Sequence, residues 1–452
     1  MSSALQHRKS KMKKVLMIAR VFPPFQSVGH SIRVVKFSKY LPALGWLPSV
    51  LTIDDRTEYE FDRKQGSETL LSEIPQDVSI YRTIAGEPSL KFVEKEREFS
   101  QRNWLIRVTV KVLSGARRWA FRNIFLPDRC LVWLPFALRR GRQIVRSEGI
   151  DVIFATCPPH SATLVGACLK RLTGKRLILD FRDDWIGAPW YHSRPTIIRM
   201  IERKLESWAV KTADKVILVT EWSKNAFLER YPTVPGDKFA FIPNGCDLEE
   251  FAVLNSMTAA PRNPRFTILH AGSLNDSTNW IRTPATLFQA VQHILQEQPE
   301  LAEKLTLAFT GSLPERQRQL VKEMGLSGVV EELGFLPRDE FLRLLHASDM
   351  LVVINYEGFA TLIPGKIYEY WAVGGPPILL LTCPGAAANF VEQHSLGLTV
   401  KPSDVAGIEQ ALLSIYRQSK TTAPLRLSTA GIEAYDRQAL TRRLAEVLSM
   451  VI

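Results

Sequence analysis

Residues 14–53 read KVLMIARVFPPFQSVGHSIRVVKFSKYLPALGWLPSVLTI and contain a complete β-α-β pattern. The apolar run KVLMIARVF, residues 14–22, is typical of a buried parallel strand. After the loop PPFQSVGHS, a helical spacing places four apolar residues on one face: Val34, Phe37, Leu41 and Leu44. Gly45 stops this helix, and PSVLTI, residues 48–53, is the next strand. Such a unit, with Gly29 at the mouth of its helix, predicts a doubly wound parallel sheet.

The alternation of strand and helix continues on both sides of a polar break. Three further strands are predicted in the first half: DVIFAT (151–156), RLILDF (176–181) and KVILVT (215–220). Residues 255–264 are rich in Asn, Ser, Thr, Ala and Pro, which is typical of a linker. Beyond it the predicted strands are RFTILHAG, LTLAFTG, VVEELGF, MLVVIN and PPILLL, within residues 265–381. The pattern predicts two α/β domains.

We expect two Rossmann-like, doubly wound parallel-sheet domains whose strands end at a shared cleft, the default ligand site of such folds. The predicted boundaries are a basic tail (1–14), a first domain (15–254), a linker (255–264), a second domain (265–426) and a final helix (427–452). The final helix is expected to pack back on the first domain.

The composition indicates a folded protein. Of 452 residues, 46% are hydrophobic and 23% charged, close to the averages of globular proteins, which excludes disordered, collagenous and coiled-coil classes. The five cysteines form no CxxC pair, which argues against a zinc ribbon or a disulfide framework. We therefore expect reduced cysteines and a cytoplasmic protein.

The net charge of +12 predicts an anionic partner, and most of it lies in one segment. Residues 104–146 hold ten basic side chains against one acid, Asp128. A helical projection of residues 104–122 gives an apolar side and a neighbouring basic side: Arg107, Lys111, Arg118 and Arg122. Such a helix favours the surface of an anionic membrane, where the protein would be peripheral. An ordinary domain helix packed on the sheet explains the same pattern, and both interpretations stand.

Five segments, in this order and at these separations, resemble family-four glycosyltransferases of the two-domain GT-B fold: FPPFQSVGHSIRVVKFSKYLPALGW, DFRDDW, FIPNGCD, HAGSL and PGKIYEYWAVGGPPILLL. The resemblance covers almost the whole chain and is closest to the bacterial branch that builds surface polysaccharides. It implies that the first domain binds the acceptor and that the second binds a nucleotide sugar.

The resemblance further implies a retaining, metal-independent hexosyltransferase that uses no cofactor. Its co-substrate is a nucleotide diphosphate sugar, and its acceptor is a glycan carried on a lipid such as a polyprenyl chain. The reaction that the resemblance implies belongs to exopolysaccharide, capsule or O-antigen biosynthesis at the inner face of the cell membrane. The second half has no clustered acids beside a strand to hold a metal-diphosphate, whereas cations and glycine turns offer the stabilisation that a leaving diphosphate needs.

On the donor side, the resemblance assigns the ribose to Glu369, whose carboxylate accepts from both ribose hydroxyls. Lys366 and adjacent backbone amides meet the diphosphate. The family has an earlier glutamate eight positions before Glu369, and here that position is Thr361. This difference indicates different contacts with the donor sugar. Glu357 could take the place of the missing glutamate only if the loop is rearranged. A solvated acid favoured by the helix dipole is the structural alternative for Glu369.

Three more residues are donor-site candidates. Gly272 lets the backbone approach the phosphates, and Gly29, at the first strand-to-helix turn, lets it approach the leaving phosphate or the acceptor. Many relatives have an arginine directly after the glycine that corresponds to Gly272, but here Ser273 follows it. The nearest base is Arg282, which we expect in a loop before a helix. A structural turn glycine and an exposed arginine are the alternatives.

On the acceptor side, ATCPPHS and LDFRDDW both end predicted strands. His160 is a candidate to orient the acceptor hydroxyl, because histidine titrates near neutral pH. Many relatives carry a histidine where this chain reads Asp180 to Asp184; we expect Asp183 or Asp184 to accept the acceptor's proton and Arg182 to hold a phosphate or orient an acid. A capping or buried histidine and a salt-bridged loop are the structural alternatives.

Two rival functions remain at this level. A nucleotide-sugar epimerase shares the two-domain architecture and turns over the donor without an acceptor. An inactive scaffold or a nucleic-acid-binding protein would use residues 104–146, but no nucleic-acid module matches and aromatic residues for base stacking are few, so no nucleic-acid partner is expected.

Overall fold

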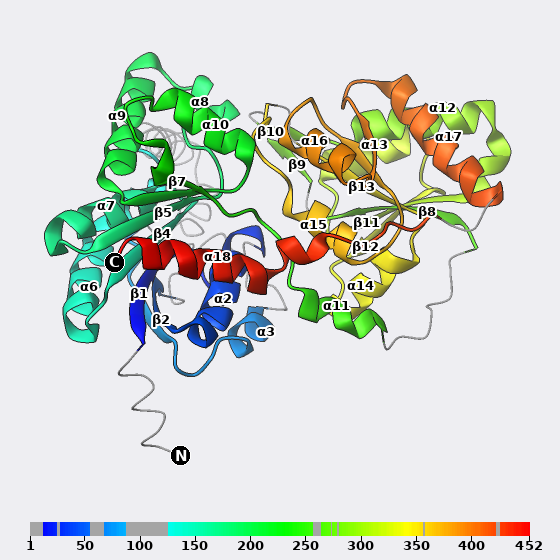
Figure 1. Cartoon of the computed structure of the whole chain (residues 1–452). Helices are drawn as coiled ribbons and strands as arrows, with labels where there is room; N and C mark the ends of the chain where they lie inside the picture. Colours follow the sequence, from blue (N-terminus) through cyan, green and yellow to red (C-terminus); the bar gives the residue numbers. More distant parts are fainter. Residues whose placement is uncertain are drawn as a thin grey trace, which may run out of the picture.

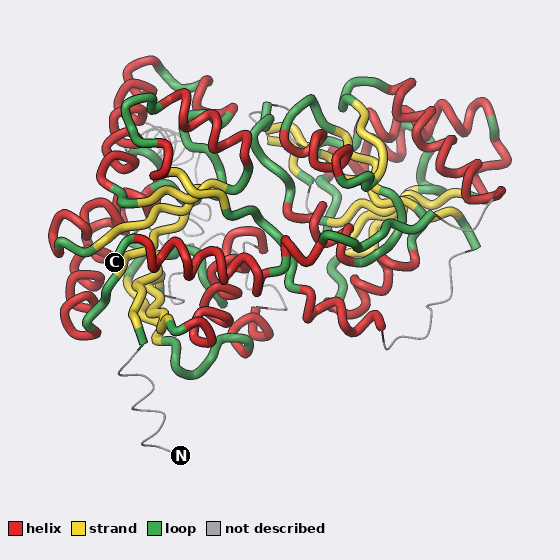
Figure 2. Tube along the Cα trace, viewed as in Figure 1, coloured by secondary structure: helices red, strands yellow, loops and turns green. Residues whose placement is uncertain are grey.

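The structure is a computed structural model with two α/β domains side by side (Figure 1). It describes residues 12–24, 28–54, 67–86, 125–255, 264–272, 274–277, 280–355, 358–421 and 425–452. In each domain the strands form a central layer and the helices cover it (Figure 2).

The first domain contains a seven-stranded parallel sheet in the order β3-β2-β1-β4-β5-β6-β7. The strands are β1 (Lys13–Ile18), β2 (Trp46–Ile53), β3 (Ser79–Thr83), β4 (Val152–Cys157), β5 (Arg176–Phe181), β6 (Lys215–Leu218) and β7 (Phe239–Phe241). The doubly wound sheet and the five predicted strands are confirmed. The edge strands β3 and β7 were not predicted.

Helices cover both faces of this sheet. One face carries α2 (Val28–Tyr40) and α3 (Ser67–Ser72); the other carries α6 (Leu134–Glu148), α7 (Ser161–Thr173), α9 (Thr196–Thr212) and α10 (Glu221–Arg230). Short helices fill the connections: η1 (Leu41–Leu44), η2 (Arg129–Trp133), α8 (Pro189–His192) and η3 (Gly236–Lys238).

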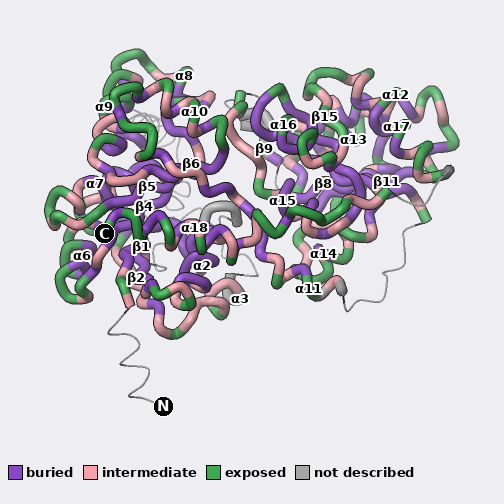
Figure 3. The backbone as a smooth tube through the Cα atoms, in the orientation of Figure 1, coloured by how far each residue is buried: buried purple, intermediate pink, exposed green. Residues whose placement is uncertain are grey.

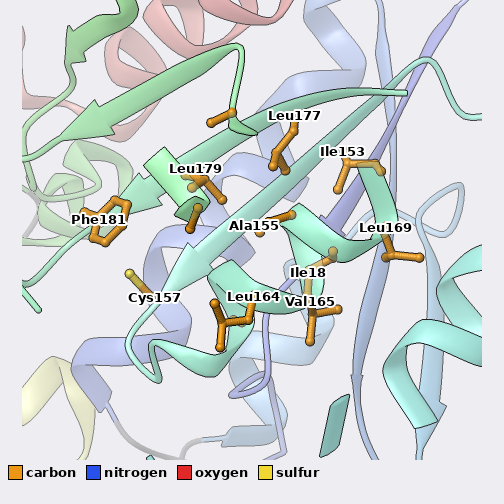
Figure 4. Close-up of a cluster of buried hydrophobic side chains, with 14 of the residues drawn as sticks. Ile18, Ile153, Ala155, Cys157, Leu164, Val165, Leu169, Leu177, Leu179 and Phe181 are labelled. Atoms are coloured by element: carbon orange, nitrogen blue, oxygen red, sulfur yellow. The ribbon is translucent and has the colours of Figure 1, made fainter. Parts of the chain in front are cut away.

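Strand alternation divides the core of the first domain into two layers. In β1, Leu16 and Ile18 face the α6–α10 side, while Val15 and Met17 face α2. Because side chains alternate along a strand, a central strand buried on both faces is an unbroken apolar run. Figure 4 shows the first layer, in which apolar side chains of α7, Val165 among them, pack against β4 and β5.

The second domain contains a six-stranded parallel sheet in the order β12-β11-β8-β13-β14-β15. The strands are β8 (Phe266–Ala271), β11 (Leu305–Thr310), β12 (Val330–Gly334), β13 (Met350–Ile354), β14 (Ile378–Leu381) and β15 (Gly397–Val400). The five predicted strands are confirmed. The edge strand β15 and an antiparallel hairpin, β9 (Asn275–Ser277) with β10 (Trp280–Arg282), were not predicted.

Here too the helices form two layers. One face carries α12 (Ala285–Glu297), α13 (Glu315–Glu323) and α17 (Val405–Thr421), with η4 (Pro299–Glu303). The other carries α14 (Arg338–Ala347), α15 (Gly365–Ala372) and α16 (Ala386–Gln393), with η5 (Ile432–Tyr435) beside α15. Buried residues concentrate in the two sheets and the helix faces against them (Figure 3).

The chain crosses between the domains twice, and the two crossings are hydrogen-bonded to each other. Cys246 N donates to Tyr435 O at 3.2 Å, and Arg437 N donates to Cys246 O at 2.9 Å. A Cβ on Gly245 would lie 1.9 Å from Tyr435 O, so only glycine fits at this crossing. The first crossing lies before α11 (Leu248–Asn255), which packs on the second domain, rather than at the predicted boundary after residue 254.

After the second crossing, α18 (Arg437–Met450) returns to the first domain and packs beside α2. Its apolar side enters the core layer that contains Val15, Met17 and Val34. The side chains involved are Leu440, Leu444, Val447 and Leu448.

Loops at the carboxyl ends of both sheets meet between the domains. The Thr220 hydroxyl, after β6, donates to Thr361 O, after β13. The rings of Trp190 on α8 and Phe359 lie 5.5 Å apart between centroids. The residues that follow the strands of one sheet therefore lie against those that follow the strands of the other.

Some predicted segments lie outside the described residues. These are the tail up to residue 11, the amphipathic helix of residues 104–122 and the linker at 256–263. β1 begins at Lys13, so the last tail residues are part of a strand. No helix within the described ranges is long and apolar enough to cross a membrane.

Candidate functional site

Gly272 and Lys366 lie together at the carboxyl edge of the second sheet. Gly272 follows β8 with φ +105°, and its N–H donates to Thr310 O at 3.0 Å. A Cβ at Gly272 would lie only 2.3 Å from Lys366 Nζ, so the ammonium group lies directly over the glycine backbone. Lys366 is the second residue of α15, whose N-terminal amides also favour anions. A cation and a helix N-terminus at one turn suit a phosphate group.

Glu369 lies on the same helix and is ion-paired. Its Oε1 accepts from Arg338 Nη2 at 2.9 Å, and the same nitrogen lies 2.7 Å from Glu250 Oε2. Burial disfavours the charged guanidinium, but the two carboxylates outweigh it and raise the pKa of Arg338 above its ordinary value. Arg338 therefore holds Glu369 beside Glu250 and compensates both charges.

The ion pairs continue from Glu250 into the first domain. Lys36 of α2, only 1% exposed, lies 2.7 Å from Glu250 Oε1 and 2.6 Å from Asp247 Oδ2. Asp247 also accepts from the Tyr40 hydroxyl at 2.8 Å. A continuous chain of ion pairs thus joins α2, which begins beside Gly29, to Glu369.

Arg338→Gln is expected to weaken binding of the nucleotide sugar that the family resemblance implies, by about fivefold, because Glu369 would lose its fixed partner. The fold should stay intact, since partly exposed ion pairs are worth roughly 1 kcal/mol or less. Calorimetric titration measures the affinity. Arg318→Gln is the matched control, since Arg318 is similarly exposed and pairs with Glu315 and Glu332 on the same domain away from α15. Equal affinities of the two variants would show that Arg338 does not position Glu369.

On the other sheet, His160 is buried before α7 and is held by aromatic stacking. Its ring lies 5.3 Å from that of Trp185 and 6.5 Å from that of Phe181, between centroids. Neither ring nitrogen has a hydrogen-bond partner among the described residues. Burial lowers the pKa of His160 to about 4, so the imidazole is neutral at physiological pH.

Arg182 joins the ends of β4 and β5. Its Nε donates to Cys157 O at 3.1 Å, and its Nη2 donates to Pro158 O at 2.8 Å. The side chain is buried, and desolvation lowers the pKa of its guanidinium from the ordinary value. Arg182 therefore places a positive charge beside Asp183 while it fixes the loop that leads to His160.

The two neighbouring acids, Asp183 and Asp184, have different environments. Asp184 is buried, binds Arg230 through both carboxylate oxygens at 2.8 Å and accepts from Gly187 N at 3.0 Å. Asp183 is half-buried and forms no hydrogen bond with a described residue. Burial raises its pKa despite the nearby Arg182. Asp184 is thus ion-paired within the first domain, whereas Asp183 has no such partner among the described residues.

The other candidates are placed as follows. Gly29 is the second residue of α2, at the carboxyl edge of the first sheet. Arg282 ends β10, opposite Asn275, rather than lying in the expected loop. Thr361 is tied to the first domain through its carbonyl, and Glu357 lies outside the described residues.

Family profiles match both domains. The profile described as Glycosyltransferase Family 4 matches residues 29–250, and the profile described as Glycosyl transferases group 1 matches residues 265–418, so the two cover most of the chain. The chain belongs to glycosyltransferase family 4.

The curated relatives of this glycosyltransferase are distant. The D-inositol 3-phosphate glycosyltransferase of Streptomyces bingchenggensis is 28% identical over 217 residues, which cover 44% of this chain and 45% of the relative. A protein of the same name from a Nocardioides species is 24% identical and matches 49% of this chain and 53% of its own. The chain spans about half the length of the curated relatives it matches.

Solved structures share the fold over nearly the whole chain. A glycosyltransferase from Rickettsia africae has a TM-score of 0.66 at 14% identity and covers 97% of this chain and 98% of its own. WaaG, a glycosyltransferase involved in lipopolysaccharide biosynthesis, has a TM-score of 0.58 at 13% identity, with 96% and 99% covered. The two parallel sheets are those of the GT-B fold.

Sequence reasoning missed one residue of the candidate site, Arg338. It is 88 positions from Glu250 and 31 from Glu369, and no local motif marks it. Within the described ranges, no three His, Cys, Asp or Glu side chains gather as potential metal ligands.

Proposed function

We propose that this family 4 enzyme moves a hexose from a nucleotide diphosphate sugar to a lipid-linked glycan, with retention of configuration and without a metal ion. The observation that carries the proposal is the grouping of Gly272, Lys366 and Glu369 at the edge of one sheet, while Asp183 lies in the loop after β5 of the other. The loops that follow the two sheets touch, which supports a site shared by the two domains.

In this proposal the second domain holds the donor. Lys366, over the Gly272 backbone, and the first amides of α15 bind the diphosphate. Glu369 accepts hydrogen bonds from both ribose hydroxyls, which a carboxylate with two oxygens can do. Arg338 occupies one lone pair of Oε1 and leaves the other acceptor positions to the ribose.

Transfer then requires one bond to form and one to break. The acceptor oxygen bonds to the anomeric carbon on the face from which the nucleotide leaves, and the bond from that carbon to the phosphate oxygen breaks. Asp183 takes the acceptor's proton, and Lys366 stabilises the charge that develops on the diphosphate. Departure and attack on one face retain the anomeric configuration.

The acceptor and the pathway are inferred from the sequence and the shared fold. The resemblance to surface-polysaccharide enzymes and the fold shared with WaaG, which is involved in lipopolysaccharide biosynthesis, favour a glycan of the cell surface. The basic segment 104–146 favours a peripheral position on the inner face of the cell membrane, where lipid-linked glycans are extended.

The experiment that tests the proposal begins with a panel of nucleotide sugars. The correct donor should raise the melting temperature, because a ligand that binds only the folded state stabilises it. If no nucleotide sugar shifts the melting temperature, the proposal fails at its first step.

Transfer of the sugar from this donor should survive a chelator, and the product should keep the donor's anomeric configuration. Lys366 and the α15 amides supply the positive charge that a metal ion supplies in other transferases. NMR of the product measures the configuration. Loss of activity in chelator with rescue by manganese, or an inverted product, would contradict the proposed chemistry.

A further inference from the structure

Helix α9 exposes an apolar stripe on the outside of the first domain. Ile197, Met200 and Ile201 are 62%, 54% and 40% exposed. Their spacing of three and four residues places them on one side of the helix. The opposite side of α9 is buried against the sheet through Ala209 and Val210. An amphipathic helix normally turns its apolar side inward, whereas α9 also has apolar residues outward.

The charges of α9 are divided between its two sides. Its acids, Glu202 and Glu206, are buried, and they bind Arg194 and Arg230 within the domain. Its outward side carries three exposed cations and no acid: Arg203, Lys204 and Lys211. On α9 itself, the exposed charges beside the apolar stripe are therefore all positive.

The same helix layer carries further exposed cations. α6, α7 and α9 lie side by side on one face of the first sheet (Figure 1). Between α6 and α7 is a hollow of about 650 Å³, lined by Arg139, Arg142 and Arg146 together with Leu138 and Leu172. No carboxylate among the described residues pairs with these three arginines. Leu172 at its edge is 51% exposed.

We propose that the outward side of α9, together with the arginine-lined hollow between α6 and α7, docks on the surface of an anionic phospholipid bilayer. The apolar stripe enters the boundary between headgroups and acyl chains, and the lysines and arginines beside it meet lipid phosphates. Charge complementarity selects this occupant, because an anionic surface satisfies the arginines of the hollow as well as the cations of α9.

This inference rests on the proposed function and adds an orientation to it. α9 starts four residues after α8, whose Trp190 contacts Phe359 of the second domain. Docking through α9 therefore brings the junction between the domains close to the bilayer. A lipid-linked acceptor would reach Asp183 without leaving the membrane.

The test is co-sedimentation of the full-length protein with vesicles of phosphatidylglycerol and phosphatidylcholine in equal parts, at low salt. Changing Ile197, Met200 and Ile201 together to Ser should reduce binding at least tenfold. The matched control changes Leu398, Leu425 and Met450 to Ser; these are exposed apolar residues of other surfaces, and their loss should leave binding unchanged. Changing Arg139, Arg142 and Arg146 together to Gln should also reduce binding, and salt should abolish what remains.

Several results would overturn the inference. The first is a wild-type protein that does not bind anionic vesicles, and the second is an α9 variant that binds as well as the wild type. The third is a variant with Arg107, Lys111, Arg118 and Arg122 changed to Gln that loses binding while the α9 variant keeps it. A dimer in solution that the α9 variant converts to a monomer would assign this face to a second copy instead.

The melting shift caused by the nucleotide sugar is measured on the same variants. Ile197, Met200 and Ile201 belong to the first domain, whereas Gly272, Lys366 and Glu369 belong to the second, so the shift should be equal in the wild type and the α9 variant. A wild type without this shift contradicts the proposed function, while its vesicle binding still reports on α9.

Discussion

Asp183→Asn should lower kcat by about 10²–10⁴-fold, the usual contribution of a general base. Asn keeps the shape of the side chain but cannot take the proton of the acceptor hydroxyl. The melting temperature should stay constant or rise. Burial raises the pKa of Asp183, so its ionised form costs folding free energy at neutral pH, and the neutral amide removes that cost. Transfer assays and thermal unfolding together separate a catalytic defect from a folding defect.

The pH profile provides a second measurement on Asp183. A base is active only when deprotonated, so kcat/KM should fall as pH falls through the raised pKa of this carboxyl, above the ordinary aspartate range. The Asn variant should lack this acid limb. If the variant keeps both the wild-type rate and the wild-type profile, another group accepts the proton.

Asp184→Asn is the contrasting variant. It removes the charge that pairs with Arg230 through both carboxylate oxygens, and breaking a buried ion pair costs about 3 kcal/mol. We expect a lower melting temperature and only a secondary loss of activity. A catalytic defect larger than that of Asp183→Asn would exchange the roles of the two acids.

Glu369→Gln should weaken donor binding by about 1.5–3 kcal/mol, roughly ten- to one-hundred-fold, because the amide loses charge-assisted acceptance from the ribose hydroxyls. The fold should be unaffected, since Glu369 is partly exposed and not part of the core. Calorimetry with the best nucleotide sugar measures the loss. Glu340→Gln, an exposed charge removal on the adjacent α14, is the control. Unchanged affinity in the Glu369 variant would leave this residue as a structural partner of Arg338 only.

The central strands were predictable because both their faces are buried. β1, β4, β5, β8, β13 and β14 are apolar runs, and the sequence shows them without any alignment. The missed strands lie at sheet edges. β3 (Ser79–Thr83) is half-buried at every position, and β15 (Gly397–Val400) has two exposed residues, so neither has a strong pattern. Pairing with a neighbour, rather than local composition, makes them strands.

The candidate site was predictable to a smaller extent. Gly272 and Lys366 are 94 positions apart, and the family motif alone suggested that both serve the diphosphate; the structure adds that they touch. Adjacent acids in DFRDDW are equivalent in sequence, and only the pairing of Asp184 with Arg230, 46 positions away, separates their roles. Long-range ion pairs of this kind have no local signature.

The return of α18 to the first domain has a consequence for protein synthesis. On the ribosome, β1 and α2 emerge first, but the core layer that they share with Leu440, Leu444 and Leu448 stays incomplete until residues 437–450 have been translated. The sheet of the second domain and its helices α12 to α17, which end at Thr421, emerge before that. Domains usually fold in the order of translation. Here the half of the enzyme that is made first finishes folding last, and its nascent form carries an uncovered apolar surface for most of the time that the chain is being made.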